Sequence, residues 1–145
     1  MTVTIDHAQP EDLPAILALL EQNALPPDGL AEHLSTTLVA REAGRVTGSV
    51  ALEVYGPSAL LRSVAVAADQ RGRGLGGQLT TAALDLAREA GVHEVYLLTT
   101  TAAGFFPRFG FAPVERAAVA PAIHQSVEWT SACPASAQVL VHPLR

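Results

Sequence analysis

Cysteine, aromatic side chains and positive charge are all scarce in this chain of 145 residues. The single cysteine, Cys133, excludes an internal disulfide and a metal site built from several thiolates, and we expect it to be a small buried hydrophobic residue. Lys and Arg number 9 against 14 Asp and Glu, which gives a net charge of -5. Because affinity for DNA or RNA depends on clustered Lys and Arg, nucleic acid is not the expected partner. We expect the partner to be a small molecule instead.

Several motifs are also missing. No run approaches the roughly 20 apolar residues that a membrane span needs, and the start MTVTIDHAQPED lacks the basic and apolar segments of a signal peptide, so we expect a cytoplasmic protein without membrane contact. The five histidines include no i, i+4 pair, so no bound metal is expected. The absence of Gly-x-Ser-x-Gly removes the commonest local signal of a serine hydrolase.

What is present suits one folded domain. A hydrophobic content of 49% and a mean hydropathy of +0.27 supply a single core, and no repeat or linker divides residues 1–145. β-branched runs predict strands, and apolar residues at steps of three and four predict helices. Strands are expected at 3–6, 36–42, 45–56, 59–66, 93–100, 111–116 and 137–144, the last two at edges, and helices at 10–23, 30–34, 75–90 and 102–110.

The order of these elements indicates an α+β or α/β class with a mixed sheet. The strand at 93–100 follows the strand at 59–66 across one helical crossover, so the two should be parallel. The helix between them should begin near Leu75, present the stripe Leu75, Leu79, Ala82, Ala83, Leu86 and Ala90, and end at a Gly91 cap.

A glycine-rich stretch, DQRGRGLGGQ at 69–78, precedes that helix and contains Gly-x-Gly-x-x-Gly at Gly72, Gly74 and Gly77. A dinucleotide-binding turn would follow its strand almost directly, whereas five residues separate Val66 from Gly72 here. Converging backbone N–H groups at a helix start nevertheless stabilise a phosphate. The stretch predicts a loop that binds a phosphorylated cofactor, with Arg71 and Arg73 at its rim.

The segment ALLRSVAVAADQRGRGLGGQL resembles the acetyl-CoA signature of the GNAT family of N-acetyltransferases, in which an Arg or Gln is followed by x-x-Gly-x-Gly or Ala. Arg71, Gly74 and Gly76 match it. GFFPRFGF is similar to the Phe-Tyr-x-x-x-Gly-Phe segment of the family, and the element order fits from about residue 2 to 142. The resemblance implies the GNAT fold: a mixed, mostly antiparallel sheet with a splayed parallel pair and helices on both faces.

The resemblance also implies acetyl-CoA as co-substrate, without a metal. Its pyrophosphate would lie on the amides of residues 71–77 and its pantetheine arm beside residues 64–66, between strands 59–66 and 94–100. A backbone N–H near Val64 would face the thioester oxygen, where negative charge develops. The implied cofactor-binding residues are Val64, Ala65, Val66, Arg71, Gly72, Arg73, Gly74, Leu75, Gly76, Gly77 and Phe106.

Transfer to an amine needs a group that takes its proton. Glu53, near the end of a strand that should neighbour the cofactor strand, is the first candidate, and the alternative is a solvated strand-end residue. Glu128 is the second candidate. The tyrosine that serves as acid in the family would fall at Phe106, so this role is vacant there, and water or Tyr96 are the conceivable substitutes.

LLRSVAV, YLLTTTAAGFFPRFGF and SACPASA together resemble the acetyltransferases encoded beside bacterial arsenic-resistance genes. LLTTTAAGFFPRFGF is also similar to N-acetylglutamate synthases, although that likeness fades after Gly110. Both resemblances imply an amino acid, or a compound that mimics one, as acceptor, and hence detoxification of an arsenical or glutamate-analogue toxin. Cys133 would contact an arsenic centre only if it is not a packing residue.

The carboxylate of such an acceptor needs a partner. Arg62, in mid-strand, suits a bidentate pair with it, and the alternative is an arginine on the solvent face paired to a surface acid. Arg116 could serve instead, and Thr99, Thr100 and Thr101 could add hydroxyl groups, although threonine in a strand also reflects β-propensity.

A different class of function is also compatible with the sequence, namely a non-catalytic acyl-CoA-binding sensor, which Phe106 would suit. A homodimer is implied by the resemblance alone, since the family often pairs through late strands.

Overall fold

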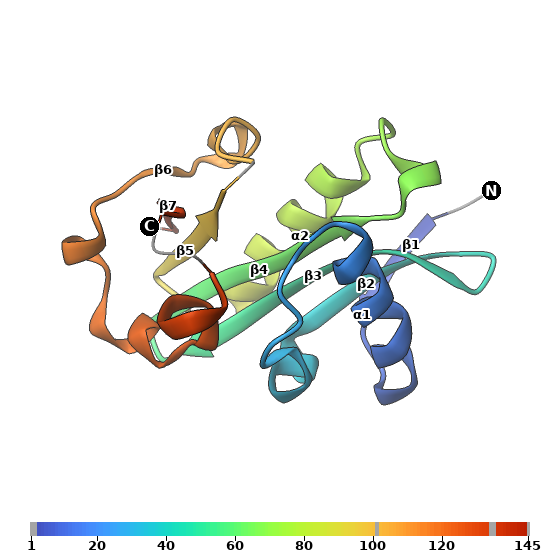
Figure 1. Cartoon of the computed structure of the whole chain (residues 1–145), viewed down its shortest axis with the longest axis horizontal. Coiled ribbons are helices and arrows are strands. Elements are labelled where there is room, and N and C mark those ends of the chain that lie inside the picture. The colour runs from blue at the N-terminus through green and yellow to red at the C-terminus, as the bar shows by residue number, and fades with distance from the viewer. Residues whose placement is uncertain (1–2, 101, 134–135, 145) are drawn as a thin grey trace.

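The computed structural model describes residues 3–100, 102–133 and 136–144. They contain a seven-stranded sheet with the order β1-β2-β3-β4-β5-β7-β6 (Figure 1). Its only parallel pair in these residues is β4–β5, and every other neighbouring pair is antiparallel. This confirms the predicted mixed sheet. The strands are β1 (Val3–His7), β2 (Thr37–Glu42), β3 (Arg45–Tyr55), β4 (Ser58–Val66), β5 (Glu94–Thr99), β6 (Ala112–Pro113) and β7 (Gln138–Pro143).

Two α-helices cover opposite faces of the sheet, α1 (Leu13–Gln22) and α2 (Leu75–Glu89) (Figure 1). Alternating residues of β3 divide between them, as the pleat of a strand requires: Leu52 packs in the cluster with α2, and Ala51 packs in the cluster with α1. The short helical turns are η1 (Pro10–Asp12), η2 (Leu30–Thr36), η3 (Ala68–Gln70), η4 (Phe106–Phe109), η5 (Arg116–Ala118), η6 (Pro121–Gln125) and the π-type η7 (Glu128–Ala132). In the described part of the chain, no helix is both long and apolar enough to cross a membrane.

The helix α2 agrees with its predicted stripe at the start but not at the end. Leu75, Leu79 and Ala83 are buried, whereas Ala90 is exposed and lies just beyond the helix. Gly91 has a φ of +80°, as a helix cap in the left-handed region requires, and this confirms the predicted C-terminal cap.

The C-terminal third departs most from the predictions. The strand expected at 111–116 shortens to the two residues of β6, because Pro113 has no N–H to donate to a ladder. The last strand, β7, was predicted at an edge, but it lies between β5 and β6. The helix expected at 102–110 is the single 3-10 turn η4.

The parallel strands β4 and β5 pair along only part of their lengths. Their register runs from the Ser58–Glu94 pair to the Leu61–Leu97 pair, although both strands continue beyond it. In β4, a register shift against β3 occurs next to Ser63, whose φ is +61°. A bulge of this kind bends a strand, and the predicted splayed pair is therefore present.

Candidate active site between the splayed strands

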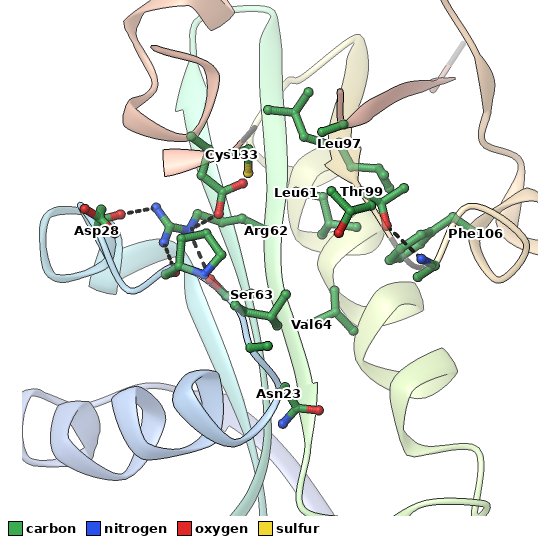
Figure 2. A pocket seen from close by; sticks show the side chains of 18 residues that line it. Asn23, Asp28, Leu61, Arg62, Ser63, Val64, Leu97, Thr99, Phe106 and Cys133 are labelled. Carbon is green, nitrogen blue, oxygen red and sulfur yellow. Dashed lines mark hydrogen bonds and ion pairs between the residues drawn. The ribbon is translucent and has the colours of Figure 1, made fainter. Parts of the chain in front are cut away.

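A cavity of about 610 Å³ occupies the gap where β4 and β5 separate (Figure 2). Residues from both strands line it, and the loop after α1, the turn η4 and the segment around η7 close its other sides. Figure 2 shows Arg62 on one side of the gap and Thr99 and Phe106 on the other, with Val64 and Asn23 toward its lower end. The β4 side is formed by Leu61, Arg62, Ser63 and Val64, and the β5 side by Leu97, Leu98, Thr99 and Thr100.

The second feature is residues 71–77, here called the glycine loop, which leads into α2. Gly74 has a φ of +76° and forms the N-cap of α2, and a Cβ atom added there would meet nothing within 4 Å. The first helical hydrogen bond runs from the Gln78 N–H to the Gly74 oxygen, so the amides of residues 75–77 precede the hydrogen-bonded part of the helix. An open helix start with a glycine cap suits the oxygens of a pyrophosphate.

The side chain of Asn23 joins the glycine loop to the cavity. Arg71 Nη2 donates to Asn23 Oδ1 at 2.8 Å, and Asn23 itself lines the cavity. Asn23 Nδ2 donates to the backbone oxygen of Val66 at 3.4 Å, at the end of β4. Arg73 is half-exposed beside the loop, with its guanidinium on Gln70 and 3.7 Å from Glu42. A phosphate on the loop and an extended arm in the gap would thus be continuous, and the residues present fit coenzyme A.

Arg62 is the centre of a buried ionic group, which we call the Arg62 cluster: Arg62, Glu53 and Glu128. Its side chain has no exposed surface; Nη1 lies 2.8 Å from Glu53 Oε2, and Nε lies 3.2 Å from Glu128 Oε2. The guanidinium also donates to the backbone oxygens of Asp28 at 2.6 Å and Pro26 at 2.9 Å. Arg62 is therefore not the solvent-facing arginine of the alternative prediction.

Glu53 lies behind Arg62 and is not among the residues that line the cavity. It is 1% exposed, which excludes the alternative of a solvated strand-end residue. Burial would raise the pKa of this carboxyl, but hydrogen bonds from Tyr55, Arg62 and Ser126 outweigh burial and lower it. A carboxylate with a lowered pKa and three partners is held ionised and is a weak proton acceptor.

Glu128 has the opposite character. It is 4% exposed and lines the cavity, and burial raises its pKa to about 7 against the attraction of Arg62. Cys133 lines the cavity beside it, and burial together with the Glu128 charge raises the pKa of the thiol to about 12. The thiol is therefore a weak nucleophile near neutral pH.

The structure places only some of the other predicted site residues at the cavity. Thr99, Thr100 and Phe106 line the cavity, and Thr99 Oγ1 accepts a hydrogen bond from the Ala102 N–H at 2.9 Å. Arg116 is outside the lining: its Nη2 donates to the oxygen of Ala137, and its guanidinium lies over Trp129. Thr101 lies outside the described residues.

Tyr96, one of the conceivable substitutes for the missing acid, points elsewhere. Its hydroxyl donates to Glu94 Oε2 at 2.7 Å and accepts the Ala120 N–H, within a separate apolar cluster. The polar or turn residues of the cavity that the sequence did not single out include Asn23, Pro26, Asp28 and Ser63. No local motif marks them, since they come from a helix end, a turn and a bulge. Among the described residues, no group of three or more His, Cys, Asp or Glu is arranged to hold a metal ion.

Comparison with known proteins agrees with this geometry. Residues 33–113, more than half of the chain, match the family described as acetyltransferase (GNAT) domain. The chain belongs to that family.

One relative and two solved structures are also similar to this chain. An uncharacterized N-acetyltransferase from Chlorobaculum tepidum is 36% identical over 90 residues, which are 61% of this chain and 57% of the relative. N-acetylglutamate synthase from Neisseria gonorrhoeae, complexed with coenzyme A and N-acetyl-glutamate, superposes with a TM-score of 0.84 at 22% identity, over 100% of this chain and 36% of that one. Rv2747 from Mycobacterium tuberculosis, in complex with CoA, has a TM-score of 0.83 at 24% identity, covering 98% and 99% of the two chains. The predicted GNAT fold is confirmed.

Proposed function

We propose that the protein is an acetyl-CoA-dependent N-acetyltransferase that acts on the amine of a small acceptor. The observation that carries the proposal is the continuity of the glycine loop with the cavity through Asn23. Family membership and the coenzyme A held by the two structural neighbours support it. A cytoplasmic location belongs to the proposal, because one cysteine permits no internal disulfide, as is usual in a reducing compartment.

Each part of the site would have a distinct task. The amides of residues 75–77, with Arg71 and Arg73, would hold the pyrophosphate, and residues 64–66 would lie along the pantetheine arm. When bound, acetyl-CoA supplies an acyl carbon that an amine can attack. The Val64 N–H would face the oxygen on that carbon, where a fixed donor contributes about 3 kcal/mol to lowering the barrier. Phe106 would cover the sulfur end of the cavity without supplying a proton.

For the acceptor we propose an amino-acid-like amine, and more narrowly an arsenical or glutamate-analogue toxin that acetylation detoxifies. The N-acetyl-glutamate bound by the Neisseria synthase supports an acceptor of this kind. Arg62 would bind the acceptor carboxylate, with Thr99 and Thr100 beside it and Arg116 as a second cation near the wall. Among the residues that the structure describes, the partners of Arg62 leave one Nη2 hydrogen, so the contact with the acceptor carboxylate is either a single hydrogen bond or requires Pro26 or Glu128 to move away.

A second function, an acyl-CoA sensor without catalysis, is favoured by one observation: Phe106 lines the cavity where the family has a tyrosine. Tight binding of acetyl-CoA with no thiol release on any amine would select it. A homodimer paired through the late strands also belongs to the proposal, and sedimentation of the purified chain tests it.

The test of the enzyme is thiol release from acetyl-CoA over a panel of acceptors. The panel contains the twenty amino acids, phosphinic and arsinic analogues of glutamate, polyamines and aminoglycosides. A reaction without acceptor, run in the wild type and in Cys133→Ser, controls for acetylation of the protein thiol. Saturable release on amino acids or their analogues is the expected result, and release confined to polyamines or aminoglycosides would overturn the proposed acceptor class.

A further inference from the structure

Two buried carboxyl groups flank one arginine, and only one of them reaches the cavity. Glu128 lies at the cavity wall with Oε2 on Arg62 Nε, and the thiol of Cys133 hydrogen-bonds to it. Glu53 contacts the other side of the same guanidinium, away from the cavity, and its second oxygen accepts the Tyr55 hydroxyl at 2.6 Å. The two groups therefore differ in access to a ligand, although both are buried.

Arg62 is fixed in place independently of any ligand. Besides the two carboxylates, it donates to the backbone oxygens of Asp28 and Pro26 and to Ser63 Oγ at 3.0 Å. A guanidinium with this many partners holds Glu128 Oε2 at one position.

We propose that Glu128 is the general base for the acceptor amine, and that Arg62 and Glu53 are positioning residues that hold and tune it. This proposal rests on the proposed function, since a base is needed only if an amine is acetylated. It places the amine of the acceptor on Glu128, at the same wall of the cavity as Arg62.

The proton balance of the step is simple. An ammonium group gives one proton to the Glu128 carboxylate and becomes a neutral amine. As the nitrogen–carbon bond forms and the carbon–sulfur bond breaks, sulfur leaves with the electron pair as a thiolate. The amine nitrogen loses a second proton, which reaches the thiolate through solvent, and Glu128 becomes a carboxylate again by releasing its proton to solvent. The overall products are the amide, the free thiol and one proton released to solvent, so no oxidant or further reactant is required.

The charged groups around Glu128 predict how its protonation responds to mutation. Arg62 lowers the pKa of Glu128, whereas Glu53 and, more weakly, Asp28 raise it; Cys133 lowers it by hydrogen bonding. Arg116 acts on Cys133, and His33 Nε2 lies 3.8 Å from Glu53 Oε1. Removing the Glu53 charge should therefore shift the pKa of Glu128 downward from about 7, and removing the Arg62 charge should shift it upward.

The experiment is the pH profile of kcat/KM between pH 5.5 and 9 for the wild type and four variants. The kcat/KM of the wild type should rise with pH through about 7, and this rise is called the acid limb. Glu128→Gln should lower kcat/KM about 100-fold or more and should abolish the acid limb. Glu53→Gln should move the limb to lower pH, Arg62→Met to higher pH, and Arg62→Lys, which keeps the charge, should leave it near the wild-type position. Glu89→Gln, on the exposed side of α2, is the matched control and should change nothing.

A second readout does not depend on turnover. In protein labelled with ¹³C at the glutamate carboxyl carbons, one resonance should titrate near pH 7 without any ligand, and it should be missing in Glu128→Gln. If that resonance is present but no acceptor is turned over, the proposed function fails and the role of base fails with it. If acetyl transfer occurs and Glu128→Gln keeps both its rate and its pH limb, the proposed function stands and the inference is wrong. Shifts of the limb in the same direction in Glu53→Gln and Arg62→Met would also overturn it.

Discussion

The glycine loop and the Arg62 cluster are built in opposite ways. The loop is a run of consecutive residues that binds through backbone amides, and its two arginines extend from exposed positions. The cluster brings together residues 53, 62 and 128, and all three side chains are buried. A phosphate that keeps part of its hydration needs only oriented amides, whereas a proton acceptor with a pKa near neutrality needs a desolvated environment.

The two regions should therefore differ in what a mutation damages. Substitutions in the loop should weaken ligand binding and leave folding intact. Substitutions in the cluster should change stability and protonation, because its charges are paired with each other and have no water to replace a lost partner.

The largest effect is expected for Arg62→Met. The variant leaves Glu53 and Glu128 buried without their cation, and breaking such a pair costs about 3 to 5 kcal/mol. Urea unfolding at pH 7.5 measures this loss. The control is Arg45→Met, which removes an exposed arginine that pairs with Asp69 through two bonds of 3.0 Å and should leave stability almost unchanged. Equal losses in the two variants would contradict the contrast between buried and exposed pairs.

Gly74→Glu should strongly weaken the binding of acetyl-CoA at the loop. A side chain there has open space but a left-handed backbone, and it adds negative charge at the helix start, so affinity for acetyl-CoA should fall about a hundredfold, or roughly 2.7 kcal/mol. Titration calorimetry gives the affinity. Gly56→Glu is a close match, because Gly56 also has a positive φ of +64° and nothing within 4 Å of an added Cβ, yet it lies in the β3–β4 turn. Similar weakening in both variants would show that charge or strain at a distance, and not the loop, controls binding.

Glu128→Gln should stabilise the folded protein at alkaline pH. A carboxyl whose pKa is raised from 4.5 to about 7 binds its proton more tightly when folded, so its contribution to stability falls as pH increases through that range. At pH 8.5 the variant should be more stable than the wild type by about 1 to 3 kcal/mol, and near pH 4.5 the gain should vanish. Thermal unfolding at the two pH values tests this, and a gain that does not depend on pH would contradict the raised pKa.

The smallest effect is expected for Arg71→Ala. An exposed arginine contributes a few tenths to about 1 kcal/mol, so the affinity for acetyl-CoA should fall by about two- to fivefold. The difference should decrease between 50 mM and 500 mM salt, because screening weakens exposed charges. A loss that persists undiminished at high salt would indicate that Arg71 acts mainly through its hydrogen bond to Asn23.

The glycine loop was predictable because its determinants are consecutive. Gly72, Gly74 and Gly76, followed by the apolar stripe that begins at Leu75, specify a turn and a helix start whatever the rest of the chain does. The parallel pairing of β4 and β5 was also predictable, because a single helical crossover connects these two strands. The shortness of β6 was less accessible, since it depends on Pro113 facing β7 in the final sheet.

The Arg62 cluster could be predicted only in parts. The sequence marked Arg62, Glu53 and Glu128 as candidates, but it ranked Glu53 first because the local pattern cannot tell which carboxyl meets the cavity. That depends on the bulge at Ser63 and on the fold of residues 119–133, which bring Glu128 to Arg62 across 66 positions of sequence. Motif analysis could not identify Asn23 and Pro26 either, because their place at the cavity also depends on the tertiary fold.

Hydrogen exchange in the presence and absence of acetyl-CoA tests most directly whether one ligand spans the glycine loop and the end of β4. We expect slower exchange both in residues 64–66 and in residues 71–77 on addition of acetyl-CoA, with both effects lost in Gly74→Glu. Protection of only one of these segments, or protection confined to other parts of the chain, would contradict the proposed site.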